Sequence, residues 1–485
     1  MTSSDIVQKL WGLCDVLRDD GINYSDYVTE LVLLLFIKME HENVKAGVRD
    51  KSLLPAKARW AYLSKLSGVD LLRAYRQALL TLSESRDARI AAIYAGAQTQ
   101  LEQPHHLEQL IKSLDALDWF SADRDGLGDM YEGLLEKNAS ETKSGAGQYF
   151  TPRPLINTMI DVIRPTAGET VQDPAAGTAG FLIAADQYIK QQTDDLFDLN
   201  QKQRNFQRRQ AFVGMELVAP TRRLALMNCL LHGIEGEGDG AVHLGNTLGQ
   251  PGTNLPKSDI ILSNPPFGTA RGGGGPTRDD LTFRTSNKQL AFLQHIVRHL
   301  KDGGRAAVVL PDNVLFESGV GTEVRRDLMD KCRVHTILRL PTGIFYAQGV
   351  KTNVVFFQKV SNKATGSTQE VWVYDLRANA PKFGKRTPLT RAYFEGFVKA
   401  YGEDPNGASP RKDEGQKGRF RRFTRAWIAT EKADSLDISW LKDGNDGDDG
   451  ELPDPAELAQ QALAELQAAM REIEGVLAEL GENNQ

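Results

Sequence analysis

Cysteine is scarce in this chain, and long apolar runs are missing. The 485 residues include three cysteines, Cys14, Cys229 and Cys332, which are isolated and odd in number. This pattern argues against a disulfide framework and a cysteine-bound zinc cluster, and it favours a reducing cytoplasm. The longest apolar run, residues 31–37, is too short to cross a bilayer, and no basic leader with a cleavage site opens the chain. We therefore expect a cytoplasmic protein with no bound metal and no membrane association.

An excess of positive charge is also missing, because the net charge is −6. Net charge is a weak test for nucleic-acid binding, since only the field that faces the phosphates matters. Arginines gather in two places, which are either phosphate contacts or an ordinary helix face and surface strand. They are Arg204, Arg208 and Arg209, and then Arg419, Arg421, Arg422 and Arg425.

The first and last parts of the chain predict helices. Residues 1–140 carry apolar side chains at helical spacing and predict a separate helical domain. Residues 446–485 start with a Gly/Asp-rich break and continue with apolar residues spaced three and four apart, as in a coiled-coil seam. We expect this tail to serve subunit assembly, although packing on the chain's own body would produce the same pattern. The N-terminal helices are expected at residues 6–17, 27–39, 71–82 and 107–117.

Residues 141–445 predict an α/β domain with a peripheral mixed region. Short apolar runs alternate with amphipathic stretches, which is typical of a mostly parallel, doubly wound sheet. Such sheets bind ligands beyond the carboxyl ends of their strands, so functional residues should follow the apolar runs. The strands are expected at residues 170–172, 211–215, 242–244, 260–262, 305–310, 334–340 and 353–359, and the helices between them at 181–188, 220–231 and 290–300.

A glycine-rich turn follows the first expected strand. It contains Asp173, Ala176, Gly177, Thr178, Ala179 and Gly180. The turn lacks the G-x-G-x-x-G spacing of dinucleotide-binding proteins and the lysine of a P-loop. A carboxylate ahead of the turn suits the ammonium group of an amino acid, and the backbone N–H groups that open the next helix suit its carboxylate.

Two further polar residues stand at the ends of the next strands. Glu216 follows the second strand, where a carboxylate can accept hydrogen bonds from both hydroxyls of a ribose. Asn246 follows the third strand, where its side chain could hold an adenine amino group. An amino acid, a ribose and an adenine together describe S-adenosylmethionine. An ordinary surface carboxylate is the alternative for Glu216.

The most informative tetrapeptide is Asn264, Pro265, Pro266 and Phe267, directly after the fourth strand. Two consecutive prolines fix φ and donate no hydrogen bond, so the strand ends in a rigid, extended loop. An exocyclic aromatic amine is a poor nucleophile because its lone pair is delocalised into the ring. The Asn264 side-chain oxygen and the Pro265 carbonyl can accept both N–H groups and stabilise the charge that develops on the nitrogen. Phe267 can stack on a base that has flipped out of the duplex.

These motifs resemble the modification (M) subunit of type I restriction-modification enzymes, over nearly the full chain. The resemblance rests on residues 147–153, 173–181 and 264–267, and on further segments at 291–295, 303–311, 340–345 and 351–357. The order of the motifs matches the γ class of amino-methyltransferases. The resemblance implies a Rossmann-like, S-adenosylmethionine-dependent methyltransferase core, a helical N-terminal domain and a helical tail.

The resemblance also implies site residues and partners. It adds Gln148, Tyr149, Phe150, Thr151, Pro152 and Arg153 to the residues that contact S-adenosylmethionine. The family methylates N6 of adenine in double-stranded DNA; two M subunits join one specificity (S) subunit, and a restriction (R) subunit can be added. A methyltransferase for protein glutamine or RNA is the main alternative, and an inactive cofactor-binding scaffold is a third. A glycine run at residues 272–275 predicts either a lid over the base or a plain flexible loop.

Overall fold

The computed structural model divides the chain into a compact unit, Met1–Ser439, and a second unit, Trp440–Gln485. Among the described helices, none is long and apolar enough to span a membrane. The predicted tail helix and the glycine run at 272–275 lie outside the described residues. The structure describes residues 3–22, 26–47, 50–117, 119, 126–141, 151–268, 276–345, 350–381, 383 and 387–441.

The N-terminal segment is helical, as predicted. Residues 6–17 do not form one helix, because the Leu13 amide bonds to the Leu10 carbonyl three residues back and interrupts the α-helical ladder after Gly12. The longest of the described helices, α3, is buried on nearly all sides, which explains its continuous apolar run. The helices are α1 Ser3–Gly12, α2 Cys14–Asp19, α3 Tyr27–Lys45, α4 Trp60–Leu63, α5 Gly68–Ser83, α6 Ala88–Tyr94, α7 Pro104–Asp115 and α8 Gly126–Glu141, with a 3₁₀ turn at Ala56–Ala58.

The rest of the unit is built around a nine-stranded sheet, whose strands lie in the order β3-β2-β1-β4-β5-β7-β6-β8-β9. Strands β3, β2, β1, β4 and β5 are parallel, and β7 lies antiparallel between β5 and β6. The mostly parallel α/β core is therefore confirmed. The strands are β1 Val171–Asp173, β2 Phe212–Glu216, β3 Val242–Leu244, β4 Ser258–Ser263, β5 Leu300–Pro311, β6 Cys332–Arg339, β7 Thr352–Lys359, β8 Glu370–Asp375 and β9 Phe420–Thr424.

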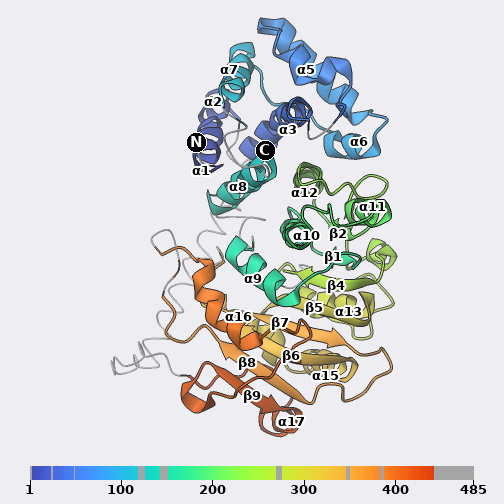
Figure 1. Ribbon diagram of the computed structural model, residues 1–485, viewed down its shortest axis with the longest axis vertical. Helices are drawn as coiled ribbons and strands as arrows, with labels where there is room; N and C mark the ends of the chain where they lie inside the picture. The colour runs from blue at the N-terminus through green and yellow to red at the C-terminus, as the bar shows by residue number, and fades with distance from the viewer. Residues whose placement is uncertain are drawn as a thin grey trace, which may run out of the picture. The chain divides into compact units, whose positions relative to one another are not determined.

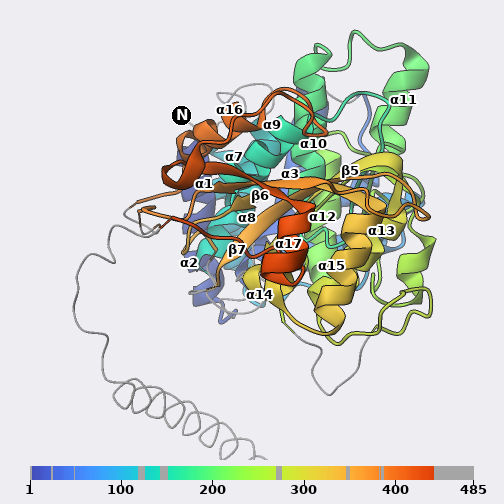
Figure 2. The same cartoon turned by 90° about the horizontal axis from the view of Figure 1, so that it is seen from below.

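Helices cover both faces of this sheet, so its central strands are buried on both sides (Figure 2). Helices α9, α10 and α16 lie on one face, and α13 and α15 lie on the other. The helices are α9 Arg153–Ile163, α10 Gly180–Gln192, α11 Gln201–Arg209, α12 Ala219–Leu231, α13 Lys288–His299, α14 Asp312–Phe316, α15 Val320–Lys331, α16 Glu395–Tyr401 and α17 Arg425–Lys432, with 3₁₀ turns at Gln250–Asn254, Arg391–Phe394 and Gly415–Lys417.

The N-terminal helices pack on the sheet domain through α12, which contacts α3, α6 and α8 (Figure 1). Arg223 of α12 donates to the carbonyl oxygens of Ile93 and Ala95, at 2.7 and 2.8 Å. Arg89 pairs with Glu235 at 3.1 Å. The predicted boundary near residue 140 falls inside one compact unit and stays a prediction.

Candidate active site

The glycine-rich turn connects the end of β1 to the start of α10. Ala179 precedes the helix with a φ of 69°, and Gly177 also has a positive φ, of 53°. A non-glycine residue in this region is strained and persists only where its surroundings hold it. Gly180 cannot carry a side chain freely, since an added Cβ would lie 3.2 Å from Cδ1 of Ile156 on α9.

Asp173 connects the turn to residues 264–267, the predicted catalytic loop. Its carboxylate is 1% exposed and accepts hydrogen bonds from the Ala175 amide, at 3.0 Å, and from the Ser263 hydroxyl, at 2.9 Å. Ser263 is the last residue of β4 and immediately precedes Asn264. Burial raises the pKa of Asp173 to about 7, and the two hydrogen bonds oppose this shift.

Glu216 stands at the end of β2, as predicted, and faces the turn. It accepts hydrogen bonds from the amides of Gly177, at 3.0 Å, and Val218, at 2.8 Å. Burial raises its pKa above the ordinary value for glutamate. Asn246 follows β3, and its side-chain oxygen accepts from the Leu248 amide at 3.0 Å.

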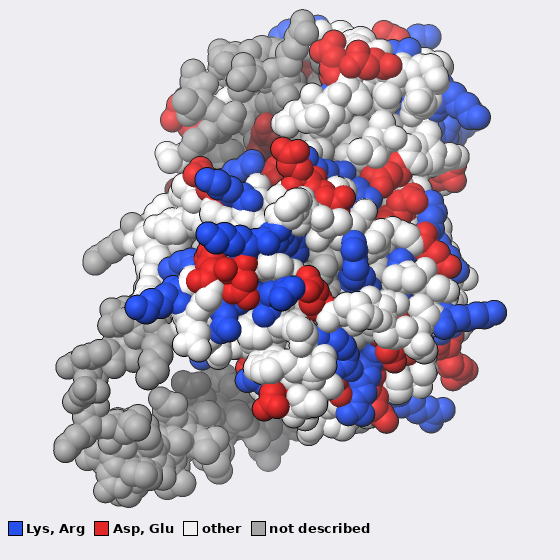
Figure 3. Space-filling view, turned by 60° about the horizontal axis from the view of Figure 1, so that its bottom comes forward, with Lys and Arg blue, Asp and Glu red and all other residues white. Residues whose placement is uncertain are grey.

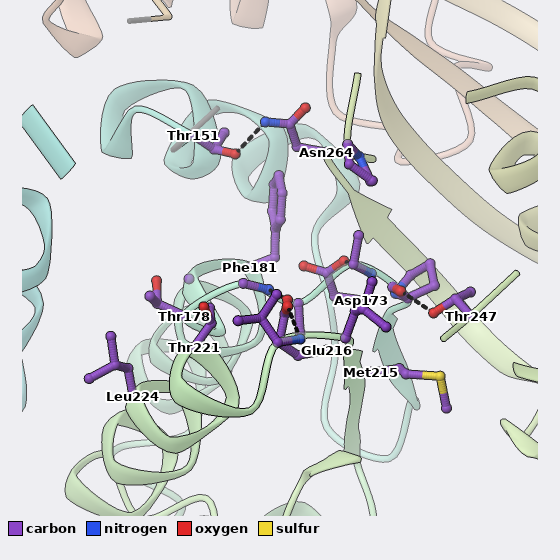
Figure 4. A pocket seen from close by; sticks show the side chains of 18 of the residues that line it. Thr151, Asp173, Thr178, Phe181, Met215, Glu216, Thr221, Leu224, Thr247 and Asn264 are labelled. Atoms are coloured by element: carbon purple, nitrogen blue, oxygen red, sulfur yellow. Dashed lines mark hydrogen bonds between the residues drawn. The ribbon is translucent and has the colours of Figure 1, made fainter. Parts of the chain in front are cut away.

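The catalytic loop begins where β4 ends, and two neighbours hold it. Nδ2 of Asn264 donates to the Thr151 hydroxyl at 3.0 Å. Figure 4 shows the side-chain oxygen of Asn264 directed away from Thr151. Gln289 on α13, which is 1% exposed, donates to the Pro266 carbonyl at 2.8 Å. Phe267 packs edge-on against Phe345, with ring centroids 6.2 Å apart.

One cavity of about 670 Å³ brings the turn and the loop together (Figure 4). Four of the predicted site residues that the structure describes do not line this cavity: Pro152, Ala179, Pro265 and Phe267. Three further predicted residues, Gln148, Tyr149 and Phe150, lie outside the described part of the chain. The predicted residues that line it are Thr151, Arg153, Asp173, Ala176, Gly177, Thr178, Gly180, Glu216, Asn246, Asn264 and Pro266.

Other lining residues were not predicted from the sequence. Thr247, Leu248, Leu217 and Val218 directly follow Asn246 and Glu216, so their position after the strands could have identified them. Phe292 belongs to a segment that carries the family resemblance, residues 291–295, but it was not assigned to the site. No motif in the N-terminal segment indicates that residues of α3 and α8 also line the cavity. These residues are Thr29, Glu132, Leu135, Glu136 and Asn138.

The charged side chains around the cavity suit a ligand with positive groups. Among the described lining residues, the carboxylates are Glu132, Glu136, Asp173 and Glu216, and the cations are Arg153 and Lys288. Arg153 pairs with Glu132, and burial lowers the pKa of this arginine to about 10. The carboxylates therefore outnumber the cations, which fits the sulfonium and ammonium groups of S-adenosylmethionine.

Two arginines of the second cluster pair with acidic residues. Arg422 pairs with Glu370 at 3.4 Å, and Arg425 pairs with Asp434 at 2.6 Å. On the face shown in Figure 3, Lys and Arg side chains are interspersed with Asp and Glu. The surface-strand interpretation is confirmed for Phe420–Thr424, which form β9, and a phosphate contact of these arginines stays a prediction.

Comparison with known proteins identifies the family. The model described as N-6 DNA Methylase matches residues 122–425, and the HsdM N-terminal domain model matches residues 6–114. The methylase subunit of the type I restriction enzyme StySPI from Salmonella potsdam is 53% identical, with 99% of this chain and 96% of that protein covered.

Solved structures agree with this result. The crystal structure of the type I restriction enzyme EcoKI M protein is similar, at 48% identity and a TM-score of 0.60, covering 98% of this chain and 96% of that one. A structure described under complex assembly and conformational transition of the type I restriction-modification system has 26% identity and a TM-score of 0.69, covering 99% and 98%. The chain therefore belongs to the N-6 DNA methylase family, among the methylase subunits of type I restriction enzymes, and it is a DNA methyltransferase.

Proposed function

We propose that this chain transfers a methyl group from S-adenosylmethionine to N6 of an adenine flipped out of double-stranded DNA. The observation that carries the proposal is the cavity that both Asn264 and the glycine-rich turn line. A specificity (S) subunit supplies target recognition, with two M subunits per S subunit, and a restriction (R) subunit can join the assembly. This proposal assigns a helical domain to residues 1–140, the catalytic domain to residues 141–445 and the assembly tail to residues 446–485.

The fit of the cofactor rests on the residues around the turn. The Glu216 carboxylate takes the ribose hydroxyls, Asn246 lies toward the adenine end, and Asp173 lies toward the ammonium group. Residues 148–153 wall the methionine end. When bound, S-adenosylmethionine supplies an electrophilic methyl group. Carboxylates outnumber cations in the cavity, and this charge balance favours a cationic ligand, whose binding would in turn favour the ionised form of the buried carboxylates.

The catalytic loop acts on the amino group of the base. Thr151 holds the Asn264 amide nitrogen, which orients the side-chain oxygen. That oxygen and the Pro265 carbonyl accept the two N–H groups of the amine and favour a tetrahedral nitrogen. Positive charge develops on this nitrogen during transfer, so both hydrogen bonds strengthen in the transition state. Phe267 stacks on the base, which offsets part of the few kcal/mol that base flipping costs.

The test uses the chain assembled with its S subunit and labelled S-adenosylmethionine. Label should appear in N6-methyladenine after the DNA is digested to nucleosides. Asn264→Ala should lower turnover by a factor on the order of a hundred or more, as expected for loss of one preorganised polar group, and should leave cofactor binding intact. Asn205→Ala, on exposed α11, is the matched control and should methylate normally.

Two outcomes contradict the proposal. Label in cytosine, RNA or protein glutamine would exclude adenine in DNA as the substrate and favour the alternative methyltransferase. Loss of cofactor affinity in Asn264→Ala, measured by calorimetry, would mean that this side chain serves the cofactor rather than the base.

A further inference from the structure

Helix α8 of the N-terminal segment closes one side of the cavity and reaches the glycine-rich turn through a single carboxylate. Glu132 of α8 pairs with Arg153, whose Nη1 donates to the Gly180 carbonyl at 3.2 Å. Oε1 of Glu132 also accepts from Nδ2 of Asn228 on α12 at 3.3 Å, and this nitrogen donates to the Thr178 carbonyl at 2.9 Å. One side chain of α8 is thereby connected to the turn by two routes.

The two routes end on either side of the strained residue. Thr178 and Gly180 flank Ala179, the residue with a φ of 69° at the start of α10. A conformation of this kind costs about 1–3 kcal/mol and is kept only where neighbouring groups fix the backbone. Hydrogen bonds to the carbonyls before and after Ala179 are suited to fix it.

Both intermediaries are held away from water, which makes Glu132 important for them. Asn228 is 1% exposed. Burial lowers the pKa of Arg153 to about 10, so its charge is costly without a counter-charge. Removing the Glu132 charge would take away the direct ion-pair partner of this guanidinium and leave Asp129 as its nearby counter-charge, so the positive charge beside the cavity would be less compensated and would oppose a cationic ligand.

We propose that Glu132 is a positioning residue through which the docked N-terminal helices hold the cofactor turn in its binding conformation. This inference rests on the proposed function, since it assigns regulation of the same site. Coupling between two binding events is reciprocal. Docking of α8 therefore strengthens S-adenosylmethionine binding, and S-adenosylmethionine strengthens the docking of α8.

The same helix offers a matched control. Asp129, about one turn before Glu132, accepts from Nε2 of Gln187 at 3.1 Å and lies 3.7 Å from Nε2 of His232. Like Glu132 it contacts the sheet domain, but neither it nor these two partners line the cavity. Asp129 also acts on Arg153 through its charge, so Asp129→Asn removes one nearby carboxylate charge but leaves both hydrogen-bonded routes from Glu132 to the turn in place.

The first experiment measures S-adenosylmethionine affinity of the full chain by calorimetry. Glu132→Gln should weaken binding about tenfold, the range for a charge-assisted hydrogen bond, while Asp129→Asn should stay within about twofold of the unchanged protein. Equal affinities for the two variants would overturn the inference, because general docking of α8 would then suffice. An unchanged protein that binds no S-adenosylmethionine would instead refute the proposed function, and the inference with it.

The second experiment needs no variant and tests reciprocity. Amide hydrogen exchange is followed in the unchanged protein with and without S-adenosylmethionine. Exchange should slow in α8, whereas α5, whose main contacts are with other N-terminal helices, serves as the internal control and should not change. Binding of S-adenosylmethionine without slower exchange in α8 would overturn the coupling while leaving the proposed function intact.

Discussion

Replacing Gln289 by leucine tests whether α13 holds the catalytic loop in place. Gln289 is 1% exposed, and its amide donates to the Pro266 carbonyl at 2.8 Å, two residues after Asn264. Leucine keeps a similar volume but removes the donor. A buried acceptor left without its partner costs about 1–3 kcal/mol. Because Pro266 itself is exposed, water can replace part of this hydrogen bond. We therefore expect its loss to cost about 1 kcal/mol, which is equivalent to about a fivefold change in an equilibrium constant.

This cost should be visible in turnover rather than in cofactor binding. The loop would occupy its productive conformation less often, so kcat falls about fivefold at saturating S-adenosylmethionine. The assay is methyl transfer by the chain assembled with its S subunit, with cofactor affinity measured separately by calorimetry.

Gln294→Leu provides the comparison. Gln294 lies on the same helix, is 6% exposed, and bonds to the backbone of Phe283 rather than to the catalytic loop. The Gln294→Leu variant should be less stable but should keep its kcat. An unchanged kcat in Gln289→Leu, or an equal loss in both variants, would refute a specific role of Gln289 in holding the loop.

Three further predictions follow from the site and the tail. Thr151→Ala should reduce kcat several-fold, since Asn264 loses the oxygen that orients its amide, and Thr151→Ser should restore it; equal rates in all three proteins would contradict this role. Asp173 has a pKa raised to about 7, so the folded chain keeps a proton that the unfolded chain releases. The contribution of this residue to the free energy of unfolding should therefore be largest below about pH 4 and decline up to about pH 7. Chemical denaturation at several pH values should show a smaller decline for Asp173→Asn, and an identical pH profile would refute the shift. Deleting residues 455–485 should weaken assembly with the S subunit on a sizing column, and an unchanged complex would exclude the tail as the assembly element.

The sequence predicted the parts of the fold whose signal is local. The expected strands at residues 211–215 and 260–262 overlap β2 and β4, because short buried strands of a parallel sheet are mostly apolar, and the expected strand at 170–172 overlaps β1. The family resemblance is confirmed by the comparisons. Strand β8 was not assigned within the mixed region, and β9 was offered only as one of two interpretations of the second arginine cluster. The two strands pair antiparallel although they lie far apart in the sequence, and such a pairing leaves no local signal.

The parts of the site that were missed depend on contacts between distant segments. Glu132 lies on a helix with no recognisable motif, and only the packing of α8 on α12 brings it to Arg153 and Asn228. The arginines of β9 read as a cationic cluster in the sequence. The acidic partner of Arg422 is Glu370, which comes from β8, so only the fold reveals this pair.

The hydrogen bond between Ser263 and Asp173 has a consequence for how this enzyme could change its targets. It joins the last residues of two adjacent strands, β1 and β4, directly below the turn and the loop. In the proposed reaction, the framework of the sheet would therefore set the separation between methyl donor and acceptor. If an S subunit reads the DNA, as proposed, exchanging that subunit would alter which DNA site is delivered, while the reaction geometry would stay the same.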